Sequence, residues 1–163
     1  MKPSDHSPKL IMLIGLPASG KTTWTNKFLA QNPGYTVVSS DDIIERYAKK
    51  DGINYSQAFH KYADVADKEF KQELQAALQA KKNIIVDRTN MSKKSRNKIL
   101  SNVPKGYERI AVVFDVARPE LDKRLVQREY DTGKRIPKEV VDGMHASYSP
   151  PSKEEGFAEI IQG

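Results

Sequence analysis

Apolar residues along this chain follow two alternating patterns, short continuous runs and longer stretches with three- and four-residue spacing. The run from Leu10 to Ile14 is apolar at every position and stops at Gly15, which predicts a strand buried on both faces. Similar short segments recur between the stretches of helical spacing. Strands are therefore predicted at residues 10–14, 35–38, 83–87, 109–116 and 157–161.

The longest helical pattern runs from Tyr55 to Ala80, and its aromatic residues Phe59, Tyr62 and Phe70 are predicted to be core residues. Pro119 and Pro137 each open a further helix, because proline is tolerated in a first turn. The predicted helices cover residues 21–31, 55–80 and 91–102, together with segments that follow Asp41, Pro119 and Pro137. Strands separated by helices imply a doubly wound α/β fold with a mainly parallel sheet of about five strands.

The 163 residues fit one domain, spanning 1–163, with residues 1–8 expected to be flexible. No apolar run has membrane-spanning length, and the amino terminus lacks the pattern of a signal peptide, so a cytoplasmic location without a membrane partner is the expectation. The absence of cysteine excludes disulfides, thiolate metal sites and a cysteine nucleophile. The oligomeric state is left open.

Positive charge is concentrated in residues 88–109, which carry seven cationic side chains against the single Glu108. That local charge of +6 equals the net charge of the whole chain. One interpretation is an ordinary solvated helix face. The other is a surface that binds the phosphate backbone of a nucleic acid.

Residues 15–22 read Gly-Leu-Pro-Ala-Ser-Gly-Lys-Thr, which is a complete P-loop pattern between a predicted strand and a predicted helix. Backbone N–H groups at such a helix start bind phosphates, Lys21 neutralises the outer phosphates, and the Thr22 hydroxyl coordinates Mg²⁺. The motif predicts a P-loop NTPase fold with ATP and Mg²⁺ as cofactors. The expected nucleotide-binding residues are Gly15, Pro17, Ala18, Ser19, Gly20, Lys21, Thr22, Thr23, Arg124 and Arg128.

Asp41 follows the second predicted strand, at the edge of the sheet where ligands bind in doubly wound folds. Its carboxylate is a candidate general base for an alcohol acceptor. The alternative is that Asp41 or Asp42 only caps the next helix. Asp87 ends the third strand, where it is a candidate for positioning the acceptor or a magnesium-bound water, or else pairs with Arg88.

Arg124 and Arg128 lie four residues apart, ahead of a polar connection, and residues 120–137 are predicted to form a helical lid. Arginines that fold over the nucleotide would stabilise charge on the transferred phosphoryl group. The alternative is an exposed helix with intrahelical pairs such as Arg124 with Glu120.

Together these motifs resemble the polynucleotide 5′-hydroxyl kinases, including the phage enzyme and the kinase domain of animal polynucleotide kinase-phosphatase. Segments 15–24, 32–35, 41–42 and 113–116 are similar to the phage kinase, as are Lys123, Arg124 and Arg128 to its lid helix. Segments 87–90, 95–96 and 151–160 are similar to the animal domain. The resemblance implies Asp41 as general base and Arg128 as the arginine on the transferred phosphate, with Lys21 as the third catalytic residue. It further implies substrate binding by Asp41, Asp87, Arg88, Asn90 and Arg96, and Arg46 is expected to contact the acceptor in place of an arginine that the family carries beside the base.

The sequence departs from this family beside the base, where arginines are replaced by Ser40 and Ile44. The predicted function is transfer of the ATP γ-phosphate to a 5′-hydroxyl end of single-stranded DNA or RNA. Alternatives are a kinase for a hydroxymethylated base in DNA, a small-molecule kinase, and a non-catalytic module that binds ATP and nucleic acid. The P-loop domain of heterogeneous nuclear ribonucleoprotein U is also similar, at the loop and on the third strand.

Overall fold

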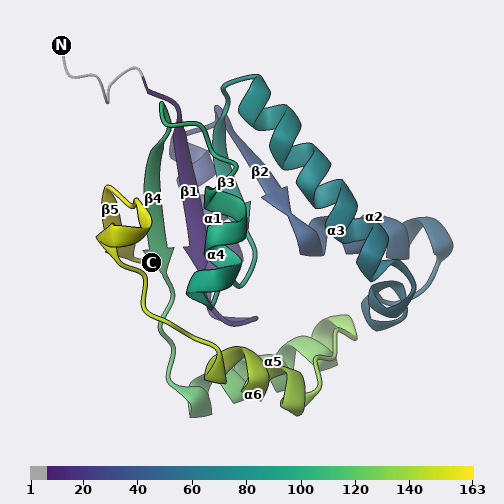
Figure 1. Cartoon of the computed structure of the whole chain (residues 1–163). Coiled ribbons are helices and arrows are strands. Elements are labelled where there is room, and N and C mark those ends of the chain that lie inside the picture. Colours follow the sequence, from purple (N-terminus) through teal and green to yellow (C-terminus); the bar gives the residue numbers. More distant parts are fainter. Residues whose placement is uncertain (1–6) are drawn as a thin grey trace.

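The centre of the molecule is a five-stranded sheet, in a computed structural model that describes residues 7–163 (Figure 1). The strand order is β2-β3-β1-β4-β5, and every neighbouring pair is parallel. The strands are β1 (Lys9–Ile14), β2 (Tyr35–Ser39), β3 (Asn83–Asp87), β4 (Glu108–Val113) and β5 (Glu159–Gln162). The predicted α/β fold with about five strands is confirmed.

Three of the helices begin where a neighbouring side chain satisfies one of their first N–H groups. Ser39, Asn54 and Ser92 each accept a hydrogen bond from a backbone N–H inside the helix that follows. Proline opens the two helices late in the chain. The helices are α1 (Lys21–Gln31), α2 (Ser40–Asp51), α3 (Tyr55–Gln79), α4 (Lys93–Leu100), α5 (Arg118–Thr132) and α6 (Lys138–Ala146), with a 3₁₀ turn at Lys153–Glu155.

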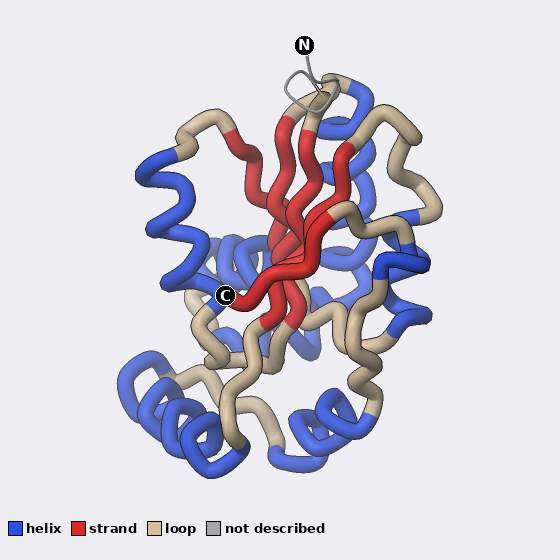
Figure 2. The backbone as a smooth tube through the Cα atoms, turned by 90° about the vertical axis from the view of Figure 1, so that its left-hand side faces the viewer, coloured by secondary structure: helices blue, strands red, loops and turns tan. Residues whose placement is uncertain are grey.

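Helices cover both faces of the sheet (Figure 2). Side chains of β1 alternate between the faces, because successive residues of a strand point in opposite directions. Leu10, Met12 and Ile14 pack with α2, α3 and α4, whereas Ile11 and Leu13 pack with the aromatic side of α1. The continuous apolar run of β1 therefore reflects a strand that is buried on both sides.

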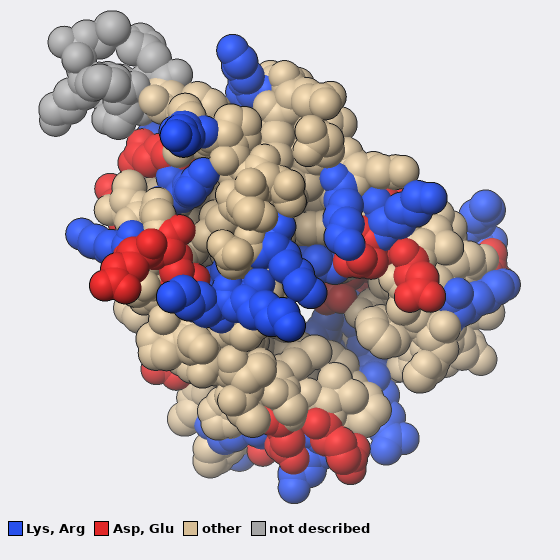
Figure 3. Space-filling model, in the orientation of Figure 1, with Lys and Arg blue, Asp and Glu red and all other residues tan. Residues whose placement is uncertain are grey.

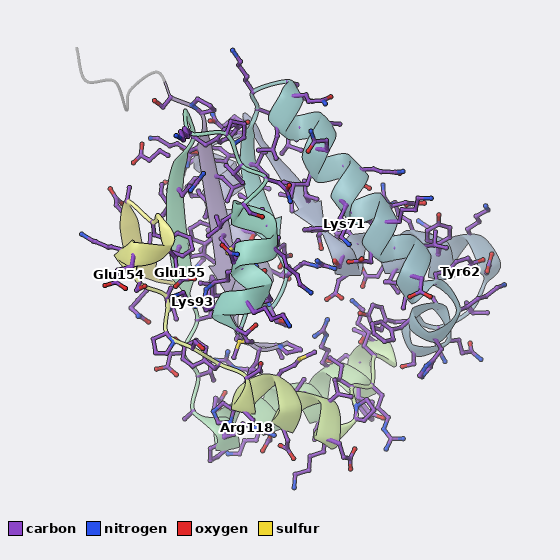
Figure 4. All side chains as sticks on the ribbon, in the orientation of Figure 1. Tyr62, Lys71, Lys93, Arg118, Glu154 and Glu155 are labelled. Carbon is purple, nitrogen blue, oxygen red and sulfur yellow. The ribbon has the colours of Figure 1, made fainter. Side chains whose placement is uncertain are left out.

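Helices α5 and α6 form a hairpin beyond the carboxyl ends of the strands, and we call residues 118–146 the lid hairpin (Figure 1). Leu121 and Val141 pack against Leu16 of the P-loop and Met91. Arg118, labelled in Figure 4, pairs with Asp122 and with Asp142 of α6, which ties the two helices together. The lid hairpin extends beyond the predicted lid at 120–137.

Several predicted boundaries shift by a few residues. Helix α4 begins at Lys93 because Ser92 caps it, and Met91 instead joins the core of the lid hairpin. Strand β5 begins at Glu159 rather than at Phe157. Phe157 precedes the strand and is buried in the main core. The expectation of flexibility at residues 1–8 falls mostly on residues 1–6, which lie outside the described residues. Within residues 7–163, no helix has both the length and the apolar character needed to cross a membrane.

Candidate active site

The P-loop between β1 and α1 owes its curvature to residues without bulky side chains. Ala18 (φ 65°) and Gly20 (φ 106°) adopt left-handed backbone conformations, which glycine tolerates best. Gly15 has no space for a side chain: a Cβ there would lie 2.6 Å from Ser19 Oγ and 2.9 Å from Phe114 Cβ. The backbone path therefore depends on the residues that define the motif.

The start of α1 offers unsatisfied donors to an anion. No side chain caps the helix at Gly20, so its first N–H groups remain available. The Ser19 hydroxyl is buried and, within the described residues, has no hydrogen-bond partner. Leaving such a group unpaired costs about 1–3 kcal/mol. A phosphate oxygen in the loop would supply the missing acceptor.

Lys21 places a positive charge inside the same loop. Its ammonium group donates to the Gly15 carbonyl oxygen at 2.7 Å. Burial lowers the pKa of Lys21, while the nearby carboxylates of Asp87 and Asp41 oppose that shift. Those acidic neighbours favour the charged form that phosphate binding requires.

The P-loop forms one wall of a cavity of about 1220 Å³. The other walls are the start of α2, the start of α3, the end of β3 and the lid hairpin. This volume exceeds the roughly 300–1,000 Å³ of ordinary ligand pockets, so there is room for a nucleotide and a second substrate. The predicted site residues that line it are Pro17, Ala18, Ser19, Gly20, Lys21, Thr22, Thr23, Asp41, Asp87, Arg88, Arg124 and Arg128.

Asp41 lies in the first turn of α2, and its two carboxylate oxygens face different partners. Oδ1 accepts a hydrogen bond from the Tyr55 hydroxyl at 2.5 Å, and Oδ2 lies 3.9 Å from Nη2 of Arg128. The helix is capped by Ser39, whose Oγ accepts from the backbone N–H of Asp42. Neither aspartate side chain is needed as the cap, so the Asp41 carboxylate remains directed into the cavity.

Tyr55 was not predicted as a site residue, yet it connects α3 to Asp41. Burial and the adjacent Asp41 charge raise the pKa of Tyr55 above its ordinary value, so the hydroxyl stays protonated and donates. Lys134, in the connection between α5 and α6, lies over the Tyr55 ring at 5.1 Å and pairs with Glu45 of α2. This part of the lid hairpin therefore contacts the elements that hold Asp41.

Asp87, at the end of β3, adds a further carboxylate to a cavity that Asp41, Asp42 and Glu45 also line. Burial raises the pKa of Asp87; the Lys21 charge opposes this shift, and the negative charges of Asp41 and Asp42 add to it. Burial, followed by the Asp41 charge, likewise raises the pKa of Asp42. Negative charge is therefore concentrated in this part of the cavity, where Lys21, Arg128 and Lys134 are its cationic neighbours.

The oxygen atoms of Thr22 and Asp87 are suitable ligands for Mg²⁺, which prefers oxygen ligands and takes few of them from protein. The Thr22 hydroxyl is exposed in the first turn of α1, and the Asp87 carboxylate lines the same cavity. In the described part of the chain, no three His, Cys, Asp or Glu side chains form a metal cluster. Mg²⁺ held by Thr22 and Asp87 would also bind phosphate oxygens of the nucleotide.

Arg88 is a cationic residue of the cavity wall next to the end of β3, and three contacts hold it. Its Nε donates to Ser40 Oγ at 2.7 Å, and Nη2 donates to Asp67 at 2.7 Å. The guanidinium also lies 4.1 Å from the centre of the Phe70 ring. The alternative pairing of Asp87 with Arg88 is not observed. The kinases that this sequence resembles carry an arginine at the position of Ser40. Here the guanidinium of Arg88 lies beside that position.

Arg96 and Asn90 were expected to bind substrate, and their burial corrects that expectation. Arg96 is fully buried, where it pairs with Glu155 (labelled in Figure 4) and donates to the carbonyl oxygens of Asn90 and Met91. Asn90 is also buried and donates to the Leu13 carbonyl. Both residues support the turn that holds the P-loop.

Arg46 and Arg124 occupy different surroundings. Arg46 is exposed and pairs with Glu73 of α3, and it does not line the cavity. Arg124 makes the expected pair with Glu120 and also donates to the Ala18 carbonyl of the P-loop at 3.4 Å. Arg124 therefore forms the intrahelical pair and also contacts the P-loop, so its position is compatible with both interpretations.

Lysine and arginine side chains gather around a hollow in the face that contains α3, α4 and the lid hairpin (Figure 3). Lys93, Lys94 and Lys98 of α4 are exposed, and we call them the lysine face. Arg96 belongs to the same helix but is buried. The surface charge of α4 therefore comes from these three lysines.

Phe59 was predicted as a core residue, and that prediction was wrong. The buried stripe of α3 passes through Ala58, Ala66 and Phe70, with Tyr62 partly buried on it. This four-residue spacing places Phe59 to the side, and it is 48% exposed and lines the cavity. The small Ala58, one position away, was the available signal for the true core face.

A parallel sheet with a P-loop after β1 and a helical hairpin beyond its carboxyl edge is the architecture of the P-loop kinases, and this chain has their fold. The profile of the AAA domain family matches residues 10–151, and the chain belongs to that family.

Individual relatives include proteins with different described roles. Human heterogeneous nuclear ribonucleoprotein U-like protein 2 is 29% identical over 162 residues, which cover 95% of this chain and 21% of that protein. L-seryl-tRNA(Sec) kinase from Methanococcus maripaludis is 27% identical over 145 residues, covering 87% of this chain and 53% of the kinase. The chain thus spans only a fifth to about half of these relatives.

Among solved structures, a chain of the Pnkp1/Rnl/Hen1 RNA repair complex superposes with a TM-score of 0.72 and 29% identity. The match covers 87% of this chain and 44% of that one. The similarity extends over most of the described sheet and helices, and it supports the P-loop kinase fold.

Proposed function

We propose that this protein transfers the γ-phosphate of ATP to a 5′-hydroxyl end of DNA or RNA. The observation that carries the proposal is the position of Asp41, whose carboxylate shares one cavity with the P-loop and lies 3.9 Å from Arg128 of the lid hairpin. A nucleotide site and a candidate base for an acceptor hydroxyl are thereby combined. Binding alone would not require this carboxylate.

The nucleic-acid acceptor is supported by charge and by the relatives. The lysine face is exposed on α4, and several Lys and Arg side chains gather beside the hollow in Figure 3. One similar chain comes from a structure of an RNA repair complex, and one relative is a kinase named for a tRNA substrate. A polyanionic strand is the acceptor that best accounts for both features.

In the proposed reaction, the acceptor oxygen forms a bond to the γ-phosphorus as the bond to the β,γ-bridging oxygen breaks, and ADP leaves. The acceptor proton passes to the Asp41 carboxylate. Tyr55 donates to Oδ1 of that carboxylate, which fixes its orientation and leaves Oδ2 for the proton. Arg128 and Lys21 stabilise the charge on the transferred group.

Thr22 and Asp87 are the residues that would hold Mg²⁺ or its bound water. Mg²⁺, when bound, neutralises phosphate charge during transfer. Lys21 and the Ser19 hydroxyl hold the phosphates in position. Arg124 of the lid hairpin donates a hydrogen bond to the Ala18 carbonyl of the P-loop. Excluding water from the cavity is the expected role of the lid hairpin.

The test is transfer of labelled γ-phosphate to 5′-hydroxyl oligonucleotides by the wild-type protein and by Asp41→Asn. We expect end labelling by the wild type and a loss of about 10²–10⁴-fold in the variant, because the base is removed with little change in shape. Asp64→Asn, on the exposed face of α3 away from the cavity, is the matched control.

Two outcomes would contradict the proposal. Labelling of free small alcohols without any oligonucleotide acceptor would indicate a small-molecule kinase. Binding of oligonucleotides and ATP with no transfer would indicate a non-catalytic module. Equal activity of Asp41→Asn and wild type would leave the kinase but remove Asp41 as its base.

A further inference from the structure

Two large apolar side chains are exposed inside the cavity rather than on the outer surface. Phe59 of α3 is 48% exposed and Val140 of α6 is 45% exposed, and both line the cavity. The other exposed large apolar residues of the described chain do not line it. Exposed apolar surface in a substrate cavity is unfavourable unless a ligand covers it.

Neighbouring rings hold Phe59 in place. Its ring centre lies 6.2 Å from that of Tyr55 and 6.1 Å from that of His60, which meets it edge-on at 82°. His60 is exposed and also lines the cavity. The ring is therefore positioned by aromatic contacts while part of its surface stays free for a flat ligand.

This aromatic row begins at the candidate base. Tyr55 donates to Asp41 with its hydroxyl and contacts Phe59 with its ring. A molecule whose hydroxyl lies at Asp41 can therefore extend along Tyr55 toward Phe59. On the lid side, Val140 and Ile136 supply apolar surface to the same cavity.

We propose that Phe59, with His60 beside it and Val140 on the lid hairpin, forms a subsite for the nucleobase of the acceptor's 5′-terminal nucleotide. The inference rests on the proposed function and specifies which part of the acceptor the cavity recognises. A nucleobase is flat and hangs from the sugar that carries the reacting hydroxyl, so it matches a row that starts at Asp41. A sugar or polyol acceptor has no flat apolar face to cover the ring.

Stacking recognises any base, because every base has a π-face, and it contributes about 1–3 kcal/mol per base. The subsite therefore favours a single-stranded end whose terminal base is free to leave the helix stack. It does not require a particular sequence. The lysine face would contact the strand backbone separately, through charge.

The test uses two oligonucleotides that differ only in the base of the 5′-terminal nucleotide, one complete and one abasic at that position. For the wild type, we expect the abasic end to have a kcat/KM about 10-fold lower, mainly through KM. For Phe59→Ala, the complete oligonucleotide should show the same loss, and removing the base should then cost nothing further. Phe59→Trp should restore the preference.

Val65→Ala is the matched control, since Val65 is 44% exposed on the same helix and does not line the cavity. Equal wild-type activity on the two oligonucleotides would overturn the subsite while leaving the kinase proposal intact. A Phe59→Ala defect of equal size on both would also overturn it, because the ring would then act only through Tyr55. No transfer to either by the wild type would overturn the proposed function and this inference with it.

Discussion

The P-loop side of the cavity consists of consecutive residues, whereas the acceptor side gathers side chains from α2, α3, β3 and the lid hairpin. On the P-loop side, backbone contacts dominate: the Gly15 N–H donates to the Thr89 carbonyl at 3.0 Å. On the acceptor side, side chains hold one another, as in Tyr55 with Asp41. The first arrangement tolerates little change, and the second can change its substrate by exchanging a few side chains.

For the comparison of the two sides, the largest effect is expected at Gly15, where a substitution tests how little change the P-loop backbone tolerates. Gly15→Ala would place a methyl group 2.9 Å from Phe114 Cβ and 3.3 Å from its carbonyl oxygen. We expect ATP affinity to fall by about 10–100-fold, since overpacking costs about 1–3 kcal/mol. Calorimetric titration with ATP measures this change.

Gly34→Ala is the control, because a Cβ at Gly34 would meet nothing within 4 Å. Oligonucleotide binding should be retained by Gly15→Ala if the two sides are independent. Equal ATP affinity in Gly15→Ala and wild type would show that the loop relaxes around the added methyl group.

A smaller effect is expected from the acceptor side. Tyr55→Phe removes only the hydroxyl that donates to Asp41 Oδ1. We expect kcat to fall about 10-fold with the KM for ATP unchanged, because a hydrogen bond to a charged group contributes about 1.5–3 kcal/mol and here it orients the base. Steady-state kinetics separate the two constants. Tyr130→Phe, at an 87% exposed tyrosine of α5, should have no effect.

Replacing the lysine face tests charge without touching the cavity. The triple variant Lys93→Gln, Lys94→Gln and Lys98→Gln should bind single strands several-fold more weakly. The slope of log affinity against log salt should fall by about 0.7 for each lysine that contacts a phosphate. Binding measured by fluorescence anisotropy at several salt concentrations gives this slope, and an unchanged slope would exclude this surface from strand binding.

The smallest effect concerns stability. The pKa of Asp87 is raised in the folded protein, mainly by burial, so its ionised form is disfavoured by folding. Asp87→Asn should therefore raise the stability of the ligand-free protein at neutral pH while lowering activity. A gain of about 1 kcal/mol would raise Tm by about 2–4 °C.

The sign of the pH dependence follows from the same shift. The destabilising contribution of Asp87 is fully present above its raised folded pKa and disappears as the pH falls through that value. The difference in Tm between Asp87→Asn and wild type should therefore shrink on acidification. A lower Tm for the variant at neutral pH would mean that Asp87 has a stabilising partner.

The sequence predicted the sheet, the helices and the P-loop because these depend on neighbouring residues. Asp41 could be placed in the cavity because it follows a parallel strand, and the carboxyl ends of such strands meet at one edge. The burial of Arg96 could not be predicted, since it depends on Glu155, 59 residues further along the chain. Phe59 was wrongly assigned to the core because it is large and apolar. The residue of α3 that faces the core at this turn is its small neighbour Ala58.

Tyr55 was missed for another reason. Its partner Asp41 is 14 residues earlier, on α2. The chain changes direction at Gly52 (φ 66°), where α2 ends, so no spacing rule within one helix connects the two positions. The same holds for Lys134, which contacts α2 and Tyr55 from the lid hairpin. Contacts between elements, rather than within them, define the acceptor side.

The buried pair of Arg96 and Glu155 has a consequence for how the protein is synthesised. Arg96 donates to the carbonyl oxygens of Asn90 and Met91, and the adjoining Thr89 and Asn90 hold the P-loop strand. Until Glu155 leaves the ribosome, Arg96 is a charge without its carboxylate, and burying it is unfavourable. We therefore expect a nascent chain to acquire nucleotide affinity only after the segment that carries Glu155 has docked, although the P-loop is translated earlier.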